Sequence, residues 1–119
     1  MSRQTDLLRE IAGAINTGSP YRIAEWFTED FRLHQPGAPT LPLGHAGAAQ
    51  MLARSRTLTP PINFEALDMV EQGDRVAVRW QLNATYDGKP FEESILAIYR
   101  FVDGRIGEDW GIPFRALWP

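Results

Sequence analysis

The stretch from Gly73 to Trp110 reads GDRVAVRWQLNATYDGKPFEESILAIYRFVDGRIGEDW and decides the fold. It holds three apolar-rich runs, which are separated by the pairs Asp87-Gly88 and Asp103-Gly104. An Asp-Gly pair between alternating runs is a strong hairpin signal, because tight two-residue turns need positive φ angles, which Gly accepts. The stretch therefore predicts a three-stranded antiparallel meander with about ten residues in each strand.

The alternation of residue types assigns these side chains to the two faces of a sheet. In the first run one face carries Val76, Val78, Trp80, Leu82 and Ala84. In the second run Ala97, Tyr99 and Phe101 share a face. In the third run Gly107 and Asp109 alternate with Ile106, Glu108 and Trp110. Since both faces carry apolar residues, we expect one face to pack on helices and the other on a second subunit.

Helical signals precede the meander. Apolar residues at helical spacing predict a first helix that ends near Gly18, and they are Leu7, Leu8, Ile11 and Ile15. Ser19-Pro20 is typical of a helix start and predicts a short second helix to about Thr28. A third helix is expected from about Ala46 to Thr57, with Ala49, Leu52 and Ala53 facing inward.

Between and after the helices the sequence predicts extended segments. Phe31 to His34 alternates like a short strand, residues 35–44 are rich in Pro and Gly and predict a loop, and Ile62 to Val70 begins the sheet. Helices followed by a run of antiparallel strands predict an α+β fold with the helices on one face of the sheet.

Composition excludes several classes of function. The 119 residues have the size of one domain, residues 1–119. A net charge of −3 argues against nucleic-acid binding, and no apolar run approaches the ~20 residues of a membrane span. The chain has no cysteine, which excludes disulfides and thiol catalysis. Together with a polar N-terminus that lacks secretory features, this leads us to expect a cytoplasmic protein without nucleic-acid or membrane partners.

Several short motifs of this sequence resemble those of a known family. The shared features are His34-Gln35-Pro36-Gly37 with Gly44, Gly73-Asp74-Arg75-Val76, Arg79-Trp80, Tyr86-Asp87-Gly88, and Tyr99-Arg100-Phe101 through Asp103-Gly104-Arg105-Ile106 to Glu108-Asp109-Trp110. In order and spacing they are similar to the SnoaL-like group of the nuclear transport factor 2-like superfamily. The resemblance implies a cone of three helices on a curved, mostly antiparallel sheet, a deep pocket inside it, and a homodimer through the outer sheet face. Members include polyketide cyclases, ketosteroid isomerase, epoxide hydrolases, dehydratases and non-catalytic domains.

The family's catalytic patterns match this chain incompletely. Ketosteroid isomerase would place a tyrosine near Ile11 and carboxyl groups near Gln35 and Ala97, and none of these is present. The acid of SnoaL-like cyclases falls at Phe114, and the histidine that usually precedes the tryptophan of the last strand is replaced by Asp109. Isomerase chemistry of that type is therefore not expected, and cyclase chemistry requires Asp109 to take over the role of the acid.

Asp109 is the leading catalytic candidate. By analogy with the superfamily its side chain points into the cone beside Tyr99 and Trp80. A carboxyl in an apolar environment loses hydration, which raises its pKa above about 3.9 and allows proton transfer near neutral pH. The alternative is that Asp109 pairs with an arginine, such as Arg100 or Arg115, or faces water.

His34 is the second candidate, as a base or hydrogen-bond donor at the mouth of the pocket. Its alternative is a structural histidine that bonds to a nearby backbone group. The residues expected to contact the substrate are Gln35, Leu52, Trp80, Tyr99 and Trp110. The aromatic members of this set could equally form plain core. His34 and His45 could form a metal site with Asp109 or Glu108 as the carboxylate, but their spacing does not place two ligands on one helix face, so we expect no metal. We expect no other cofactor.

These observations predict a homodimeric enzyme that performs acid/base chemistry, as an isomerase, cyclase, dehydratase or hydrolase, on a small apolar or amphipathic molecule. Two alternatives remain at this stage. One is a domain that binds a small ligand without turnover, and the other is a dimerisation module whose interior is filled.

Overall fold

The computed structural model describes residues 2–35 and 40–113. In chain order its elements are α1 (Arg3–Thr17), α2 (Ile23–Trp26), β1 (Phe27–His34), α3 (Gly44–Ala53), the 3₁₀ turn η1 (Arg54–Thr57), β2 (Thr59–Gln72), β3 (Arg75–Tyr86), β4 (Lys89–Val102) and β5 (Arg105–Pro113). This is the α+β arrangement that the order of helical and strand signals predicts.

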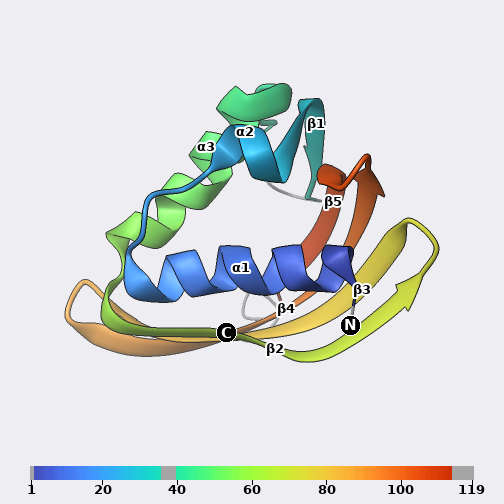
Figure 1. The fold of residues 1–119 in the computed structure, drawn as a ribbon. Coiled ribbons are helices and arrows are strands. Elements are labelled where there is room, and N and C mark those ends of the chain that lie inside the picture. Colours follow the sequence, from blue (N-terminus) through green and yellow to red (C-terminus); the bar gives the residue numbers. More distant parts are fainter. Residues whose placement is uncertain (1, 36–39, 114–119) are drawn as a thin grey trace.

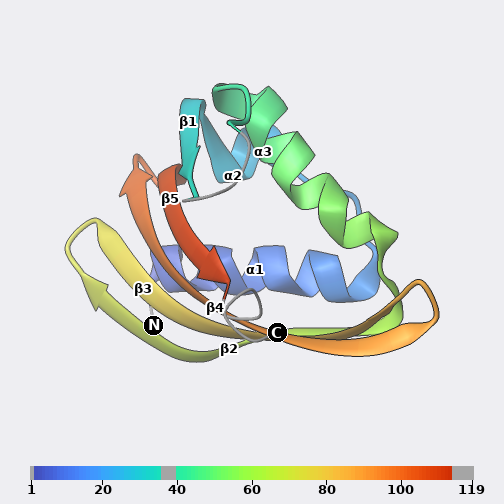
Figure 2. The same cartoon turned by 180° about the vertical axis from the view of Figure 1, so that it is seen from behind.

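The five strands form one sheet in the order β1-β5-β4-β3-β2. β1 runs parallel to β5, and every other neighbouring pair is antiparallel. The sheet is strongly curved, and all three helices lie on its concave side, with α1 crossing above the long strands β2 to β4 (Figure 1). The view from behind shows α3 on the same side of the sheet, with its N-terminal end beside β1 (Figure 2).

Both predicted Asp-Gly turns are present. Asp87 and Gly88 have φ angles of 52° and 76°, and Asp103 and Gly104 have φ angles of 50° and 81°. Two consecutive residues with positive φ are the mark of the hairpin turn whose twist matches that of the flanking strands. The three-stranded meander is thereby confirmed, with strands of 12, 14 and 9 residues.

The first helix also agrees with the prediction. The Ser2 side chain accepts a hydrogen bond from the backbone N–H of Thr5, and this caps the N-terminus of α1. At the other end Gly18 adopts the left-handed conformation, with φ at 73°, and its N–H bonds to the Ala14 carbonyl. The sequence signal at Gly18 therefore ends the helix where expected.

The prediction of the second helix is wrong in length. α2 is a single turn that begins at Ile23, and Ser19-Pro20 lies outside it. Phe27 is already the first residue of β1, and Phe27 and Phe31 are both fully buried, with ring centroids 4.8 Å apart. Burial of two aromatic side chains against the core outweighs the weak helical preference of this segment, because each buried ring contributes about 1.5–3 kcal/mol.

Two predicted orientations also need correction. In α3 the buried positions are Gly44, Gly47, Ala48 and Leu52, whereas Ala49 and Ala53 are exposed. In β5 the register shifts between Arg100 and Phe101, so that Ile106 faces the core instead of sharing a face with Glu108. One extra residue in β5, Gly107, produces this bulge.

Candidate functional site

One row of side chains on the concave face brings the leading candidate together with its neighbours. Asp109 in β5 is the cross-strand partner of Tyr99 in β4, which in turn pairs with Val76 in β3. On the other side of β5, Asp109 pairs with Leu33 in β1. Directly paired residues of neighbouring strands point to the same face, with Cβ atoms about 4.5–5.5 Å apart in an antiparallel pair. The carboxyl of Asp109 therefore sits beside the Tyr99 ring, among otherwise apolar side chains.

Asp109 is buried, with 6% of its surface exposed. Its Oδ1 atom has no hydrogen-bond partner among the described residues. Loss of hydration disfavours the carboxylate, and this burial raises the pKa of Asp109 to about 7. Such a carboxyl group is present in both protonation states at neutral pH. The alternative in which Asp109 pairs with Arg100 is excluded, because Arg100 bonds to Glu108, and Arg115 lies outside the described residues.

Small residues lie next to this carboxyl group. Ala97 and Gly111 are paired across β4 and β5, two residues along each strand from the Tyr99–Asp109 pair and therefore on the same face. A Cβ atom added to Gly111 would stand 3.4 Å from Asp109 Oδ1 and 4.0 Å from the Ala97 Cβ. The two strands themselves therefore place little bulk against the unpaired oxygen.

Tyr99 and Trp80 form a polar contact within the same apolar surroundings. The Trp80 Nε1–H donates to the Tyr99 hydroxyl oxygen over 2.9 Å. Trp80 is 2% exposed, and its ring stacks on Phe64 at a centroid distance of 4.4 Å. Burial is the main cause that raises the pKa of Tyr99 well above its ordinary value; the nearby Asp109 charge adds to the shift, and the Trp80 hydrogen bond opposes it. Tyr99 therefore stays protonated at physiological pH.

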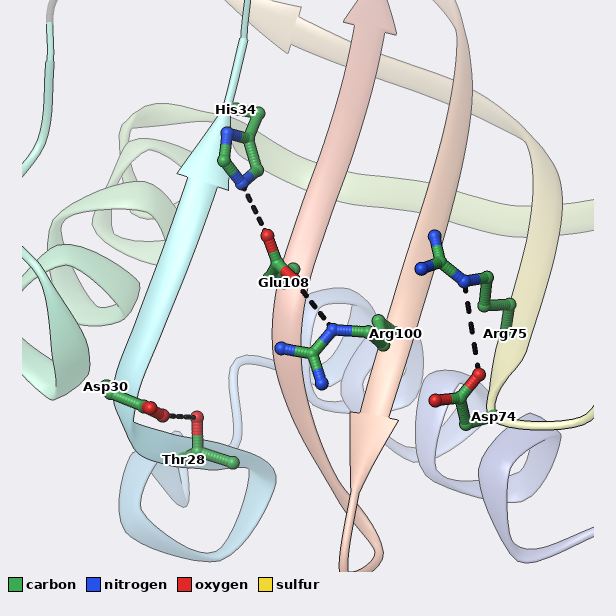
Figure 3. Close-up of polar contacts among 7 residues, drawn as sticks. All are labelled: Thr28, Asp30, His34, Asp74, Arg75, Arg100 and Glu108. Atoms are coloured by element: carbon green, nitrogen blue, oxygen red, sulfur yellow. Dashed lines mark hydrogen bonds and ion pairs between the residues drawn. The ribbon is translucent and has the colours of Figure 1, made fainter.

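His34 lies on the opposite, convex face of the sheet. It is the cross-strand partner of Trp110, and the two rings stack at a centroid distance of 5.0 Å with an interplanar angle of 8°. His34 Nε2 lies 2.8 Å from Glu108 Oε2, and Arg100 Nε donates to Glu108 Oε1 over 2.7 Å (Figure 3). His34 therefore contacts a carboxylate on the convex face. It does not lie near Asp109, and its partner is a side chain, not the backbone group that the structural alternative assumed.

Trp110 belongs to the same convex face. Its pairing places it in a row that crosses the sheet through Val70, Ala77, Ile98, Trp110 and His34. The Arg75 guanidinium lies 5.4 Å from the Trp110 ring centroid. Trp110 and His34 are therefore not brought together with Asp109, and neither can line the same site on the concave face.

The remaining expected contacts are spread over the fold. Leu52 is buried in α3, 7% exposed, as part of the core over the concave face. Gln35 follows β1 and is half-buried. The position of the family's cyclase acid, Phe114, lies outside the described residues. Within the described residues, Trp80 bonds to Tyr99, and Tyr99 is the cross-strand partner of Asp109.

Sequence reasoning missed two features of this region. Glu108 was considered only as a possible metal ligand beside the two histidines, although it joins His34 to Arg100, and hydrogen bonds from Arg100 and then His34 lower its pKa. Gly111 was also missed, although a side chain at this position would contact Oδ1 of Asp109. The sequence does carry a signal for Gly111. Alternation places Gly111 on the same face of its strand as Asp109, and its partner Ala97 is also small.

Within residues 2–35 and 40–113, no cluster of His, Asp or Glu is placed to hold a metal ion. His45 lies apart from His34, with its Nε2 2.9 Å from the carbonyl oxygen of Phe27. No helix in the described part of the chain is long and apolar enough to cross a membrane.

Comparisons with known proteins agree with this fold. The family model of the SnoaL-like domain matches residues 8–108. Wild-type IdmH from Streptomyces antibioticus, a proposed polyketide cyclase, is 26% identical, with 97% of this chain and 94% of that chain covered and a TM-score of 0.79. Its variant with residues 96–104 of a loop truncated is 28% identical, with 95% and 94% covered and a TM-score of 0.78.

A more distant structure supports the fold alone. A proposed polyketide cyclase from Acidithiobacillus ferrooxidans is 22% identical, with 97% of this chain and 90% of that chain covered and a TM-score of 0.82. None of the curated proteins matches the sequence.

Proposed function

Because the chain belongs to the family of SnoaL-like domains, we propose that it is a small enzyme that moves protons on an apolar or amphipathic molecule bound at the concave face. Asp109 is the acid/base group, and Tyr99 and Trp80 contact the substrate. Binding takes place in the cone between the curved sheet and the helices, so the molecule that enters is small.

The buried carboxyl group of Asp109, whose Oδ1 atom has no hydrogen-bond partner among the described residues, carries this proposal. A buried polar atom without a hydrogen bond is unfavourable for stability, and such groups concentrate where they serve a function. With its pKa at about 7, Asp109 is present in both the protonated and the ionised form at neutral pH. A pKa close to the working pH is the best value for a group that must both donate and accept a proton.

The chemistry follows from the neutral form of the acid. Protonated Asp109 donates its proton to an oxygen atom of the substrate, and the carboxylate that forms accepts a proton from a carbon or oxygen of the same molecule. The enzyme returns to its starting state, and the substrate is isomerised or prepared for ring closure. Proton transfer by one positioned group contributes about 10²–10⁴-fold to the rate. The likeness to IdmH, a proposed polyketide cyclase that is 26% identical, supports a cyclase over a hydrolase.

The convex face supports the second part of the proposal, a homodimer. Leu96, Ile98 and Ile112 are large apolar residues on this face with 43%, 45% and 49% of their surfaces exposed. Leu96 pairs with Ile112, so two neighbouring rows present apolar side chains to the outside. A contiguous exposed apolar area of this kind marks an interaction surface. We place the dimer in the cytoplasm, in line with the absence of cysteine.

A binding domain without turnover is the alternative. It is favoured by the packing of Trp80, which stacks on Phe64 and is nearly inaccessible, so this ring behaves as core. In that case Asp109 serves only as a hydrogen-bonding partner of the ligand.

An exchange experiment with an enolisable ketone tests the proposal. In heavy water, 2-tetralone exchanges the hydrogens next to its carbonyl group, and proton NMR follows the rate. We expect the wild type to accelerate this exchange, and Asp109→Asn to lose about 10²-fold or more of the acceleration. Glu108→Gln is the matched control, because Glu108 is the adjacent carboxyl on the convex face. If the wild type exchanges the ketone hydrogens no faster than buffer does, the proposed enzymatic activity is contradicted. If Asp109→Asn exchanges them as fast as the wild type, the proposed role of Asp109 is contradicted.

A further inference from the structure

The side-chain amide of Asn16 holds the backbone of an edge strand. β2 lies at one edge of the sheet, so some of its backbone groups face away from β3 and need other partners. At Phe64 two of these groups bond to one side chain of α1. Asn16 Nδ2 donates to the Phe64 carbonyl oxygen over 2.9 Å, and the Phe64 N–H donates to Asn16 Oδ1 over 2.7 Å. The amide therefore takes the place that a neighbouring strand would have at this residue.

These two hydrogen bonds lie where the pairing of β2 with β3 is interrupted. The register shifts before Asn63 and again after Ala66, so the regular stretch around Phe64 is short. Such irregularities disrupt the ladder locally. The end of α1 is well fixed, since Ile15, next to Asn16, is buried in the core. Asn16 therefore connects a firmly packed helix to a short paired segment of the edge strand.

The Phe64 ring connects these hydrogen bonds with the proposed site. It stacks on the Trp80 ring at a centroid distance of 4.4 Å with an interplanar angle of 15°. The Trp80 Nε1–H donates to the Tyr99 hydroxyl oxygen, and Tyr99 is the cross-strand partner of Asp109. A continuous set of contacts thus runs from α1, which crosses above β2 to β4, to the carboxyl group in β5 (Figure 1).

We propose that Asn16 is a positioning residue of this site, which fixes the backbone of Phe64 and thereby the orientation of the Trp80 ring. The role rests on the proposed function, because the contacts matter for catalysis only if the substrate binds beside Trp80 and Tyr99. The alternative is a purely structural tether, in which Asn16 fastens α1 to the sheet and nothing more.

Leucine at position 16 separates the hydrogen bonds from the size of the side chain. Asn16→Leu removes both bonds and keeps a similar volume. We expect the Phe64 N–H to lose about tenfold or more of its protection from hydrogen exchange. The Nε1–H resonance of Trp80 should shift, because the ring loses its fixed orientation. The Nε1–H of Trp26 should keep its position; it donates to Glu10 of α1 over 2.6 Å and therefore reports any movement of the helix.

Gln4 provides the matched control near the other end of α1. Its Nε2 donates to the Gly73 carbonyl oxygen over 3.1 Å and to Glu71 Oε2 over 2.6 Å, so this amide also fastens the helix to the sheet. Gln4→Leu removes these bonds without touching Phe64. The Trp80 resonance should therefore stay where it is in the wild type.

A milder variant, Asn16→Asp, removes only one of the two bonds. A carboxylate still accepts from the Phe64 N–H but has no donor for the carbonyl oxygen. The Trp80 resonance should shift in the same direction as in Asn16→Leu, and the Phe64 N–H should keep more of its protection. This variant decides the question if the leucine variant does not fold.

The rate of ketone exchange provides a readout that a purely structural tether would not change. With 2-tetralone, Asn16→Leu should lower kcat about threefold or more and leave KM within about twofold, because the substrate contacts remain while one ring beside the substrate is less well oriented. Gln4→Leu should leave both constants unchanged.

The outcomes separate this inference from the proposed function. An unprotected Phe64 N–H in the wild type, or an unchanged Trp80 resonance in a folded Asn16 variant, overturns the positioning role. An equal shift of the Trp80 resonance in Gln4→Leu overturns it as well, because any loosening of α1 would then disturb the ring. So does an unchanged kcat in an active Asn16→Leu variant. If the wild type does not accelerate ketone exchange, the proposed function fails, and the NMR readouts still decide whether Asn16 orients Trp80.

Discussion

Glu108 and Asp109 are adjacent in β5, yet their carboxyl groups lie on opposite faces of the sheet and their pKa values shift in opposite directions. Glu108 accepts hydrogen bonds from Arg100 and His34 on the convex face, and these lower its pKa. Asp109 lies among apolar side chains on the concave face, and burial raises its pKa to about 7. A strand places neighbouring residues on opposite faces, so two identical chemical groups acquire different roles within one residue of each other.

Asp109→Asn should make the protein more stable at pH 8, and the gain should depend on pH. Burial raises the folded-state pKa of Asp109 to about 7. As the pH rises from about 4 to 7, Asp109 ionises in the unfolded chain before it ionises in the folded protein, so the wild type loses stability over this range. A difference of about three pKa units corresponds to ~4 kcal/mol. Urea unfolding at pH 4 and pH 8 should show that the stability of the variant relative to the wild type increases by about this amount.

A variant that keeps a carboxyl group at position 109 is the control for this prediction. Asp109→Glu keeps an ionisable group at the site and should follow the pH dependence of the wild type more closely than the asparagine variant does. A constant stability difference between Asp109→Asn and the wild type across this pH range would show that Asp109 ionises normally in the folded protein.

Glu108→Gln should lower stability at neutral pH. The pKa of Glu108 is lowered in the folded state, so its contribution is present above the unfolded-state pKa and is lost as the pH falls below about 4.5. The charged hydrogen bonds to Arg100 and His34 are partly exposed, so we expect a loss of about 1–2 kcal/mol at pH 7 in urea unfolding. The loss should shrink toward pH 3. Glu92→Gln, at an exposed site of β4, is the control and should have little effect.

The local part of the architecture could be predicted from the sequence. The meander follows from Asp87-Gly88 and Asp103-Gly104, because the backbone of each turn requires residues that accept positive φ. The end of α1 follows from Gly18 for a similar reason. The second helix could not be predicted correctly, because burial of Phe27 and Phe31 depends on distant parts of the chain.

The site could be predicted only where it depends on one strand pair. The resemblance to the family implies that Asp109 lies beside Tyr99, and their antiparallel pairing in the structure agrees with this. The position of His34 depends instead on the register between β1 and β5, which are 70 residues or more apart in sequence, as in the pairing of His34 with Trp110. A shift of one residue would reverse its face, and no local pattern determines that register.

Ile98→Glu should weaken the proposed homodimer. Ile98 lies in the apolar row of the convex face and is 45% exposed, so a carboxylate there would be desolvated without a partner in a dimer interface. We expect the variant to sediment as a monomer at concentrations where the wild type is a dimer, in analytical ultracentrifugation. Leu43→Glu is the matched control, since Leu43 is an equally large apolar residue, 57% exposed at the start of α3. A wild type that is monomeric at every accessible concentration contradicts the proposed dimer.

Gly47→Ala and Gly13→Ala should change stability in opposite directions, although both replace a glycine within a helix. A Cβ atom at Gly47 would stand 1.9 Å from the carbonyl oxygen of Pro42, so the segment before α3 must move, at a cost of about 1–3 kcal/mol or more. A Cβ atom at Gly13 meets no other atom within 4 Å, and alanine there should add about 1 kcal/mol to the stability. Thermal unfolding of the two variants checks this, and a Gly47→Ala variant as stable as the wild type would show that α3 does not pack against the Pro42 carbonyl.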